Sequence, residues 1–272
     1  MRISSLRSLG VAGAIALSLC AAVPEASAFT LPDCAGPLEA RDVRIIRVEQ
    51  DGDLILEDGR AVLLEGLVLP RGAPDHAPSF YADQAISVLR DLAADRHVAL
   101  SMVEPKEDRW GRLRAQVFFP RAKGEAWLQL AMLRRGMARV SMAPDRGECA
   151  KPLYAAEAQA RQAHTGLWTS EAYALRAPDD LSGTIGTFQI VRGKVLSATI
   201  RNERAYLLFG PDRRHDFKVV IDPQDLRRFR DDGVDPRDYS GMMLRVRGYV
   251  DHPDAPEIEV ASPTAIEVVD AP

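Results

Sequence analysis

The residues most able to do chemistry in this sequence are carboxylates set in short glycine turns. Asp51-Gly52-Asp53 lies between two runs of alternating apolar residues, and Asp58-Gly59 follows in the same stretch. Aspartate–glycine pairs between such runs are typical of turns that join paired β-strands. These carboxylates could bind a cation such as calcium, which takes about six to eight oxygen ligands. They could equally accept hydrogen bonds from nearby backbone amides. The sequence leaves both uses open for Asp51 and Asp53.

Three segments of the sequence resemble the staphylococcal nuclease (thermonuclease-like) family. They are D-G-D at 51–53, D-G-R-A-V-L-L-E-G-L-V-L-P-R at 58–71 and D-R-W-G-R at 108–112. The family patterns are D-G-D-T, D-G-R-x-V-R-L-x-G-I-D-x-P-E and D-x-Y-G-R. A later segment, A-E-x-x-A-R-x-x-x-x-G-L-W at 156–168, is similar to the last helix of that family. The resemblance covers about residues 42–170 and implies a nuclease-like OB-fold barrel there.

The resemblance also implies a role for particular residues, two of which are retained. Asp53 corresponds to the first calcium-binding aspartate of the family, and Arg112 corresponds to the second of two arginines that clamp the scissile phosphate. The other three positions are substituted. Leu63 stands at the first arginine, Val68 at the second calcium aspartate and Arg71 at the glutamate that acts as general base.

These substitutions predict a degenerate active site. Calcium binding relies on several carboxylates, so Asp51 and Asp53 alone would be a poor remnant of a calcium site. Phosphoryl transfer relies on positioning and charge stabilisation, to which one arginine can contribute on the order of 10³–10⁵ in rate. Arg71 also places a cation where the family has its base. We therefore predict a non-catalytic binding or scaffold module that needs no cofactor.

Two alternative functions remain open at this stage. One is a weak calcium-dependent nuclease, a phosphodiesterase acting on DNA or RNA, in which Glu65 supplements the retained carboxylates and Arg112. Strand alternation would place Glu65 on the same side as Leu63, where it could substitute for a metal ligand. The other alternative is an oligonucleotide- or oligosaccharide-binding module that uses a barrel face.

The remaining motifs specify little chemistry. The histidines lack the spacing of a zinc site, and no G-x-S-x-G, Walker or Rossmann motif occurs. His215-Asp216 could transfer protons, but a surface loop is the simpler interpretation. Basic residues interleaved with aromatics in the C-terminal third could form a single-strand groove. These basic residues are Arg201, Arg204, Arg213, Arg214, Lys218, Arg227 and Arg228. Acidic residues accompany them, which favours a solvated face of mixed charge.

The composition is that of an ordinary globular protein preceded by an export signal. The 272 residues are 46% hydrophobic and 27% charged, with a formal net charge of −4. Affinity for polyanions would therefore need a local basic patch. Arg2 and Arg7, an apolar run and an A-S-A site before Phe29 predict a signal peptide over residues 1–28. Cys20 would permit a lipid anchor instead, although the preceding residue does not fit a lipobox.

Cleavage of this signal peptide would leave Cys34 and Cys149 as the cysteines of the mature chain. An even number of cysteines in an exported protein predicts a disulfide bond. Two unpaired thiols are the alternative. Such a bond would close a loop of about a hundred residues, which in the chain-entropy model contributes roughly 4–5 kcal/mol.

The hydrophobic pattern predicts a mainly β fold with helices (α+β) that begins with an OB-type barrel. Pro78 opens the first predicted helix, and Gly136 ends the second. Predicted strands lie at 43–48, 54–56, 61–68, 97–103 and 113–119, and further helices lie at about 127–133 and 153–163. Three strands, a helix and two strands are the order that an OB-type barrel requires.

The same order recurs after an apparent linker at 177–180, which predicts a second OB-like barrel over residues 183–270. Its first strand, 186–198, contains Gly193 at the bend that a small barrel needs. Asp222 and Pro223 occupy cap and first-turn positions of a helix that ends near Phe229. The other predicted strands are 205–209, 217–221, 244–250, 257–260 and 265–269.

The sequence as a whole predicts an exported, periplasmic or secreted thermonuclease-like protein without a membrane span after signal cleavage. The partner of its binding module would be an envelope protein or a nucleic acid. Calcium would be required only if the protein is still a nuclease.

Overall fold

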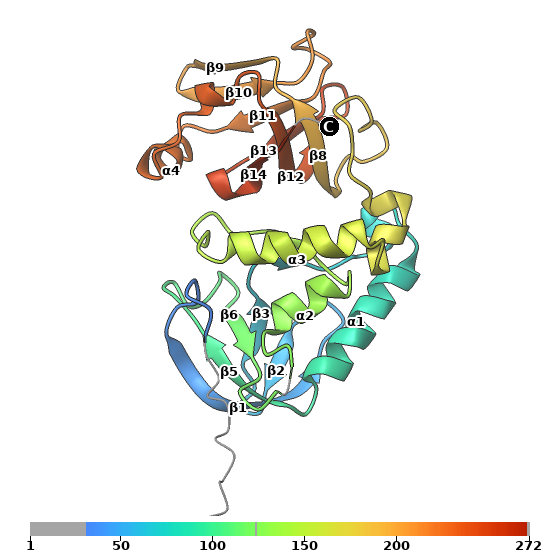
Figure 1. Cartoon of the computed structure of the whole chain (residues 1–272), viewed down its shortest axis with the longest axis vertical. Helices are drawn as coiled ribbons and strands as arrows, with labels where there is room; N and C mark the ends of the chain where they lie inside the picture. Colours follow the sequence, from blue (N-terminus) through green and yellow to red (C-terminus); the bar gives the residue numbers. More distant parts are fainter. Residues whose placement is uncertain (1–30, 123, 271–272) are drawn as a thin grey trace, which may run out of the picture. The chain divides into compact units, whose positions relative to one another are not determined.

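The structure is a computed structural model that describes residues 31–122 and 124–270. These residues belong to one compact unit, in which the second predicted domain follows the first along the chain (Figure 1). The predicted signal peptide and Cys20 lie outside the described residues. Within the part of the chain that the structure describes, no helix has the length and apolar character needed to span a membrane.

The first domain contains a closed β-barrel with the strand order β1-β2-β3-β6-β5. Its strands are β1 (Leu38–Val48), β2 (Leu54–Leu56), β3 (Ala61–Leu64), β5 (His97–Ser101) and β6 (Leu113–Phe118). β3 and β6 pair in parallel, and the other neighbours are antiparallel. Ile45, Leu54, Leu56, Leu100 and Val117 are fully buried. The predicted OB-type barrel is confirmed.

Three helices accompany this barrel, as predicted: α1 (Ser79–Ala93), α2 (Leu128–Arg134) and α3 (Ala150–Gln162). α1 begins directly after Pro78 and buries one stripe of apolar side chains. Gly136 follows α2 with φ of 62°, a conformation that favours glycine. A Cβ atom at this position would lie 2.0 Å from the carbonyl oxygen of Thr165, so no other residue fits there without a backbone shift.

The predicted strand at 61–68 is wrong in one respect, because the chain turns in its middle. β3 ends at Leu64, and the short strand β4 (Leu67–Val68) begins after a turn at Glu65 and Gly66. Gly66 has φ of 86°, which reverses the chain direction. β4 then leaves the barrel and pairs with β7 (Arg139–Val140). The simple two-residue alternation of side chains therefore does not continue past Leu64.

The second domain is a seven-stranded sheet that repeats the pairing scheme of the first. Its strands are β8 (Phe188–Lys194), β9 (Ser197–Arg201), β10 (Arg204–Leu208), β11 (Lys218–Ile221), β12 (Met243–Asp251), β13 (Glu257–Glu259) and β14 (Ile266–Val268). The predicted first strand is divided into β8 and β9. β9 pairs with β10, β10 with β11, β11 in parallel with β13, β13 with β12, and β12 with β8. Since two residues join β8 to β9, the circuit matches that of the first barrel with one interruption.

Two local features of the second domain were predicted with different success. Gly193 lies where the chain must pass close to its neighbours, because a Cβ atom there would be 2.4 Å from Pro178 and 2.9 Å from Phe209. The helix after β11 begins later than predicted: α4 spans Leu226–Asp231. A turn precedes it, in which the carbonyl of Asp222 accepts hydrogen bonds from the amides of Asp225 and Leu226, each at 3.0 Å.

The predicted linker at 177–180 follows a segment that is bonded to β8. The amide of Arg176 donates to the carbonyl of Ile190 at 3.0 Å, and the amide of Arg192 donates back to Arg176 at 2.8 Å. Leu167 and Trp168, which follow α3, share one buried cluster with Phe188 and Ile190 of β8. The chain between the domains is therefore packed onto the second sheet.

A buried ion pair also connects α3 to β12. Glu157 is 1% exposed and Arg247 is 3% exposed, and Nη1 of Arg247 lies 3.1 Å from both carboxylate oxygens of Glu157. The same carboxylate accepts the amide hydrogen of Val140 at 2.7 Å and pairs with Arg161 one helical turn later. The i,i+4 pair of Glu157 and Arg161 was predicted, but the pairing with Arg247 was not. Both charges are removed from water and need opposite charges, which Arg161 also supplies to Glu157 and Glu267 also supplies to Arg247.

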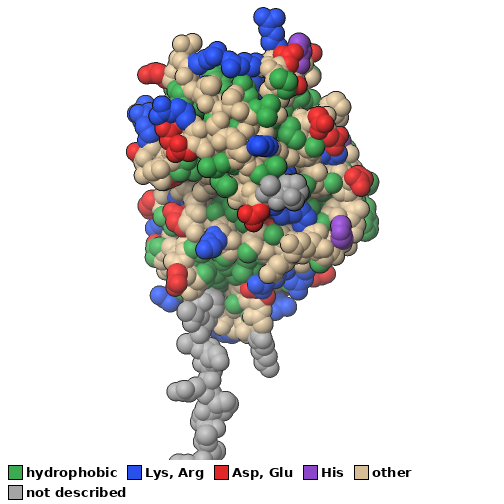
Figure 2. Space-filling view, turned by 45° about the horizontal axis from the view of Figure 1, so that its top comes forward, with side chains coloured by type: hydrophobic (Ala, Val, Ile, Leu, Met, Phe, Trp, Pro, Cys, Tyr) green, Lys and Arg blue, Asp and Glu red, His purple; other side chains and the backbone are tan. Residues whose placement is uncertain are grey.

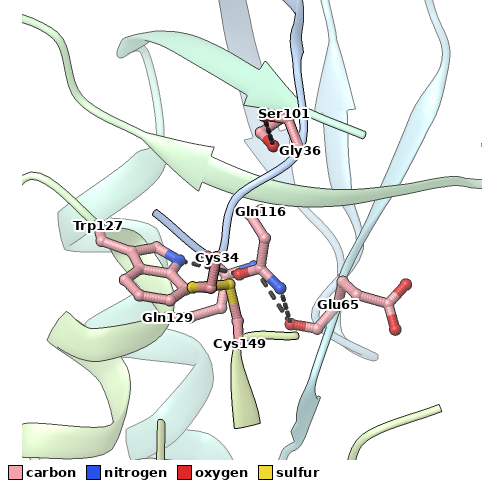
Figure 3. The surroundings of a disulfide bond; sticks show 8 residues. All are labelled: Cys34, Gly36, Glu65, Ser101, Gln116, Trp127, Gln129 and Cys149. Atoms are coloured by element: carbon pink, nitrogen blue, oxygen red, sulfur yellow. Dashed lines mark hydrogen bonds between the residues drawn. A yellow bond between two sulfur atoms is a disulfide. The ribbon is translucent and has the colours of Figure 1, made fainter. Parts of the chain in front are cut away.

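The predicted disulfide bond joins Cys34 to Cys149, with a Cα–Cα distance of 5.0 Å (Figure 3). It ties the segment before β1 to the start of α3. A buried hydrogen-bond chain lies beside it: Trp127 Nε1 donates to Gln116 Oε1 at 2.9 Å, and Gln116 Nε2 donates to the carbonyl of Glu65 at 3.2 Å. The turn that interrupts the predicted strand is thus held by the side chain of Gln116 in β6.

We expect Glu157→Ala to lower the free energy of unfolding by about 3 kcal/mol, because it leaves the buried guanidinium of Arg247 with Glu267 alone and removes the acceptor of the Val140 amide. Arg44→Ala is the matched control. It removes the exposed ion pair with Asp95, and such pairs contribute about 0–1 kcal/mol. Chemical denaturation followed by circular dichroism measures both changes. Equal small losses for the two variants would show that the buried pair does not stabilise the fold.

Candidate functional site

The five positions that the nuclease resemblance singles out lie in two groups at one end of the first barrel. Asp53 directly precedes β2, and Arg112 directly precedes β6. Leu63 lies in β3 and Val68 in β4, and Arg71 follows β4 in the loop that leads to α1. The retained residues form one group, and the substituted residues line or border a separate apolar cavity.

The retained residues, Asp53 and Arg112, form an ion-pair cluster together with Asp108. Nη1 of Arg112 lies 3.1 Å and 3.2 Å from the two carboxylate oxygens of Asp53, and its Nε donates to Asp108 at 2.8 Å. The Asp53 carboxylate is largely buried. Burial raises the pKa of Asp53, and the facing charge of Arg112 acts against that rise. Burial acts on Asp108 in the same direction, but hydrogen bonds from Arg112 and from the Trp110 amide hold its pKa below the usual value. The guanidinium thus already has two carboxylate partners.

Asp51 has the role of a turn residue. Its Oδ1 accepts a hydrogen bond from the amide of Asp53 at 3.2 Å. Within residues 31–122 and 124–270, no three His, Cys, Asp or Glu side chains gather in a way that could hold a metal ion. Asp51 thus serves the turn before β2, and the carboxylate of Asp53 faces Arg112.

The substituted positions Leu63 and Val68 line a cavity of about 350 Å³. Their neighbours in its wall are mostly aliphatic, including Leu67, Leu69 and Ile86 of α1. Asp51 and Arg71 supply charged groups at its border. Leu63 thus lies where the resemblance implies an arginine, and Val68 lies where it implies a carboxylate. The aliphatic side chains of this cavity offer no hydrogen bond to an anion.

Arg71 is the substituted residue with the most definite new role. Its Nε and its backbone amide both donate to the carboxylate of Asp75, each at 2.9 Å. Asp75 is 3% exposed and also receives Arg139 Nη2 at 3.2 Å and the hydroxyl of Tyr173 at 3.3 Å. Burial, followed by the charge of Asp75, raises the pKa of Tyr173 to about 12, so this hydroxyl stays protonated and donates.

The same cluster reaches the second domain. Arg139 is 1% exposed, donates to the carbonyl of Phe188 in β8, and has its guanidinium carbon 5.0 Å from the centre of that ring. The guanidinium of Arg71 lies 5.3 Å from the ring centre of Tyr249 in β12. These are cation–π distances. Arg71, at the position where the resemblance implies a base, therefore contacts both Asp75 and the second domain.

Strand alternation predicted that Glu65 lies on the same side as Leu63, and the structure differs from this prediction. Nε of Arg114 donates to Glu65 at 2.9 Å, and Arg146 lies 3.9 Å away. Glu65 borders the small cavity beside the disulfide, whereas Leu63 lines the apolar cavity. The turn at Gly66 separates the two side chains, because it ends the strand on which alternation was assumed.

His215 also has a different partner from the one considered. Its Nδ1 lies 2.9 Å from Asp212, and Asp216 instead accepts a hydrogen bond from the Asp212 amide at 2.7 Å. The hydrogen bond and charge of Asp212 raise the pKa of His215. The imidazole is exposed and lines none of the cavities described here. The surface-loop interpretation fits this geometry.

Residues 61–170 match the family model of staphylococcal nuclease homologues. The matched segment includes Leu63, Val68, Arg71 and Arg112, so it covers the four positions on the β3–α1 and β6 sides of the site. The first domain therefore contains a segment similar to staphylococcal nuclease homologues, and the resemblance drawn from the sequence motifs is confirmed over residues 61–170. No curated protein matches the chain.

Sequence reasoning missed the partners of the retained and substituted arginines. Asp75 and Arg139 lie 64 positions apart and carry no motif, so nothing in the sequence pairs them. Asp108 is different, because it begins the D-R-W-G-R segment and precedes Arg112 by four residues. An aspartate at that spacing in a turn is a plausible hydrogen-bond acceptor, and this signal was available.

We expect Arg139→Leu to lower the free energy of unfolding by about 3–5 kcal/mol, because it removes the buried guanidinium that pairs with the buried carboxylate of Asp75. Arg71→Ala should cost less, about 1.5–3 kcal/mol, because the Arg71 side chain is 40% exposed and its backbone amide still donates to Asp75. Urea unfolding curves measure both. Arg121→Ala, which removes an exposed pair with Asp42, serves as the control. The reverse order of the two losses would contradict the assignment of Asp75 as the buried centre.

Proposed function

We propose that this thermonuclease-like protein is a non-catalytic binding module whose active site has become structural. The observation that carries the proposal is the position of Arg71. Its guanidinium is held by buried Asp75 and by the Tyr249 ring, at the place where the family resemblance implies a general base. A guanidinium cannot accept a proton from water near neutral pH.

The residues at the other catalytic positions of the family also lack the chemistry that those positions need. Leu63 cannot donate the paired hydrogen bonds with which an arginine clamps a phosphate, and Val68 cannot ligate calcium. The remaining arginine, Arg112, is shared between Asp53 and Asp108. Phosphodiester cleavage would require this cluster to open and the apolar cavity to accept a charged group. Each lost role would cost about 3–4 kcal/mol of transition-state stabilisation, although such losses are not additive.

Export to the periplasm or the exterior is part of the proposal. The A-S-A segment before Phe29 supports cleavage of a signal peptide, and the Cys34–Cys149 disulfide supports an oxidising compartment. An envelope protein is the partner we favour. A nucleic acid is the other partner considered, and a nuclease assay distinguishes catalysis on it from simple binding.

The purified protein should cleave neither DNA nor RNA above background, with or without calcium. Calcium should also leave its thermal midpoint unchanged, because a ligand stabilises only a fold that binds it. The restoring variant carries Leu63→Arg, Val68→Asp and Arg71→Glu together, and it should gain a calcium-dependent rise in the midpoint. Arg71→Glu alone is the control, since it breaks the contact with Asp75 without rebuilding the metal shell.

Robust calcium-dependent cleavage by the unmodified protein, abolished by Asp53→Ala, would overturn the non-catalytic assignment. Calcium-dependent stabilisation without cleavage would instead indicate a structural metal site. Both readouts use the same preparation, so a folding defect in the triple variant cannot be mistaken for either result.

The mature protein secreted from a heterologous host should begin at Phe29 and contain no free thiol. Intact mass should correspond to residues 29–272 less two hydrogens, because the Cys34–Cys149 bond removes them. A lipid adduct on Cys20 would give a longer and heavier chain, and would contradict the cleavage site. A thiol titre of two per chain would contradict the disulfide.

A further inference from the structure

The second domain has a cavity at the position that corresponds to the substituted nuclease site of the first. In the first domain, the cavity lies between the β1–β2 loop, the segment after β3 and helix α1. In the second domain, the equivalent elements are the β9–β10 turn, the segment after β11 and helix α4. They line a cavity of about 800 Å³, which also includes residues 233–237 after the helix.

The floor of this second cavity is apolar and accessible. Leu226 and Val234 belong to or pack against the core of the domain, and both line the cavity. Ile200 at the end of β9 is 41% exposed, which is unusual for an isoleucine of a β-strand. Strand β9 is the last strand of its sheet and pairs with β10 alone among the described residues. The wall on that side is therefore open to a ligand.

Two arginines at the border of the cavity have no carboxylate partner. Arg227 and Arg230 form no ion pair within residues 31–122 and 124–270, and both are exposed. Their neighbour Arg228 is paired with Asp225, and Arg237 in the same wall is paired with Asp235. The charges of Arg237 and Asp235 thus cancel.

Glu203 in the β9–β10 turn is the one remaining acidic lining residue, and no ion pair links it to the arginines in the described part of the chain. Two guanidinium groups and one carboxylate leave an excess of one positive charge. The border of the cavity is therefore complementary to an anion, in contrast to the apolar cavity of the first domain.

We propose that this cavity binds a small organic anion. Its phosphate or carboxylate group would be held by Arg227 and Arg230, and its apolar body would pack on Ile200, Leu226 and Val234. Guanidinium groups suit both anions, because they donate two hydrogen bonds in a plane. The volume lies within the range of about 300–1,000 Å³ that is typical of small-molecule sites.

A long polyanion fits the surface less well. On the face shown in Figure 2, lysine and arginine side chains are interspersed with aspartate and glutamate rather than joined in one basic track. The formal net charge of the whole chain is also negative, at −4. Binding of a nucleic acid would need several phosphate contacts in a row. The inference does not rest on the proposed loss of catalysis, since it concerns other residues in another domain.

Fluorescence titration with 8-anilinonaphthalene-1-sulfonate, an anionic amphiphile, tests this site on the full chain. We expect saturable binding that the double variant Arg227→Gln/Arg230→Gln weakens by at least about tenfold, since each charge-assisted hydrogen bond contributes that order of affinity. Arg213→Gln/Arg214→Gln, in the exposed β10–β11 loop, is the matched control and should bind the probe as the unmodified protein does. The neutral probe N-phenyl-1-naphthylamine should bind both double variants equally. This probe also reports on the apolar cavity of the first domain.

Competition on the unmodified protein provides a second readout that needs no variant. Hexyl phosphate and hexanoate should displace the anionic probe and rank the two head groups, whereas inorganic phosphate should displace it only weakly. Equal competition by inorganic phosphate would overturn the role of the apolar floor. Stronger competition by a single-stranded oligonucleotide would replace a small-molecule site with a polyanion surface. Unchanged probe affinity in the Arg227→Gln/Arg230→Gln variant would overturn the proposal itself, whatever the probe binds elsewhere.

Discussion

The buried carboxylate of Asp75 is the charge on which the arrangement of the site depends. A carboxylate at 3% exposure is costly unless hydrogen bonds and opposite charges replace its water. Here Arg71, Arg139 and Tyr173 supply them. The three donors come from the loop before α1, from β7 and from the segment after α3. One desolvated group therefore fixes the positions of three segments that are distant in the sequence.

This constraint also fixes the loop before α1, where the family resemblance implies a catalytic residue at Arg71. An active site needs charged groups that face the substrate and are not already neutralised within the protein. In this domain Arg71 faces Asp75, and Arg112 faces Asp53 and Asp108. The residues that would face a substrate, Leu63 and Val68, are apolar. The polar groups that a nuclease would direct at phosphate are thus used to satisfy one another.

The contact between the domains also contains a buried carboxylate that is paired with a buried guanidinium. Glu157 and Arg247 are both nearly inaccessible to water, and the carboxylate also accepts the Val140 amide. Neither charge would be tolerable at this depth alone. The second domain is therefore part of the environment that the first domain requires, and the cavity lined by α4 lies at a separate place.

The local sequence determined the fold class and much of the architecture. Apolar alternation, glycine turns and Pro78 were sufficient for the barrel and its helices, because these signals act over a few residues. Motif spacing was sufficient to place Asp53, Leu63, Val68, Arg71 and Arg112 on the nuclease framework. The pairing of Cys34 with Cys149 followed from their even number.

Only the tertiary structure decided which charges meet. Arg71 and Arg139 converge on Asp75, and Glu65 turns away from Leu63 at Gly66, because backbone direction and burial set these contacts over long sequence separations. The cost of burying these charges depends on the folded environment, so the sequence pattern could identify the positions but not the contacts that their side chains make.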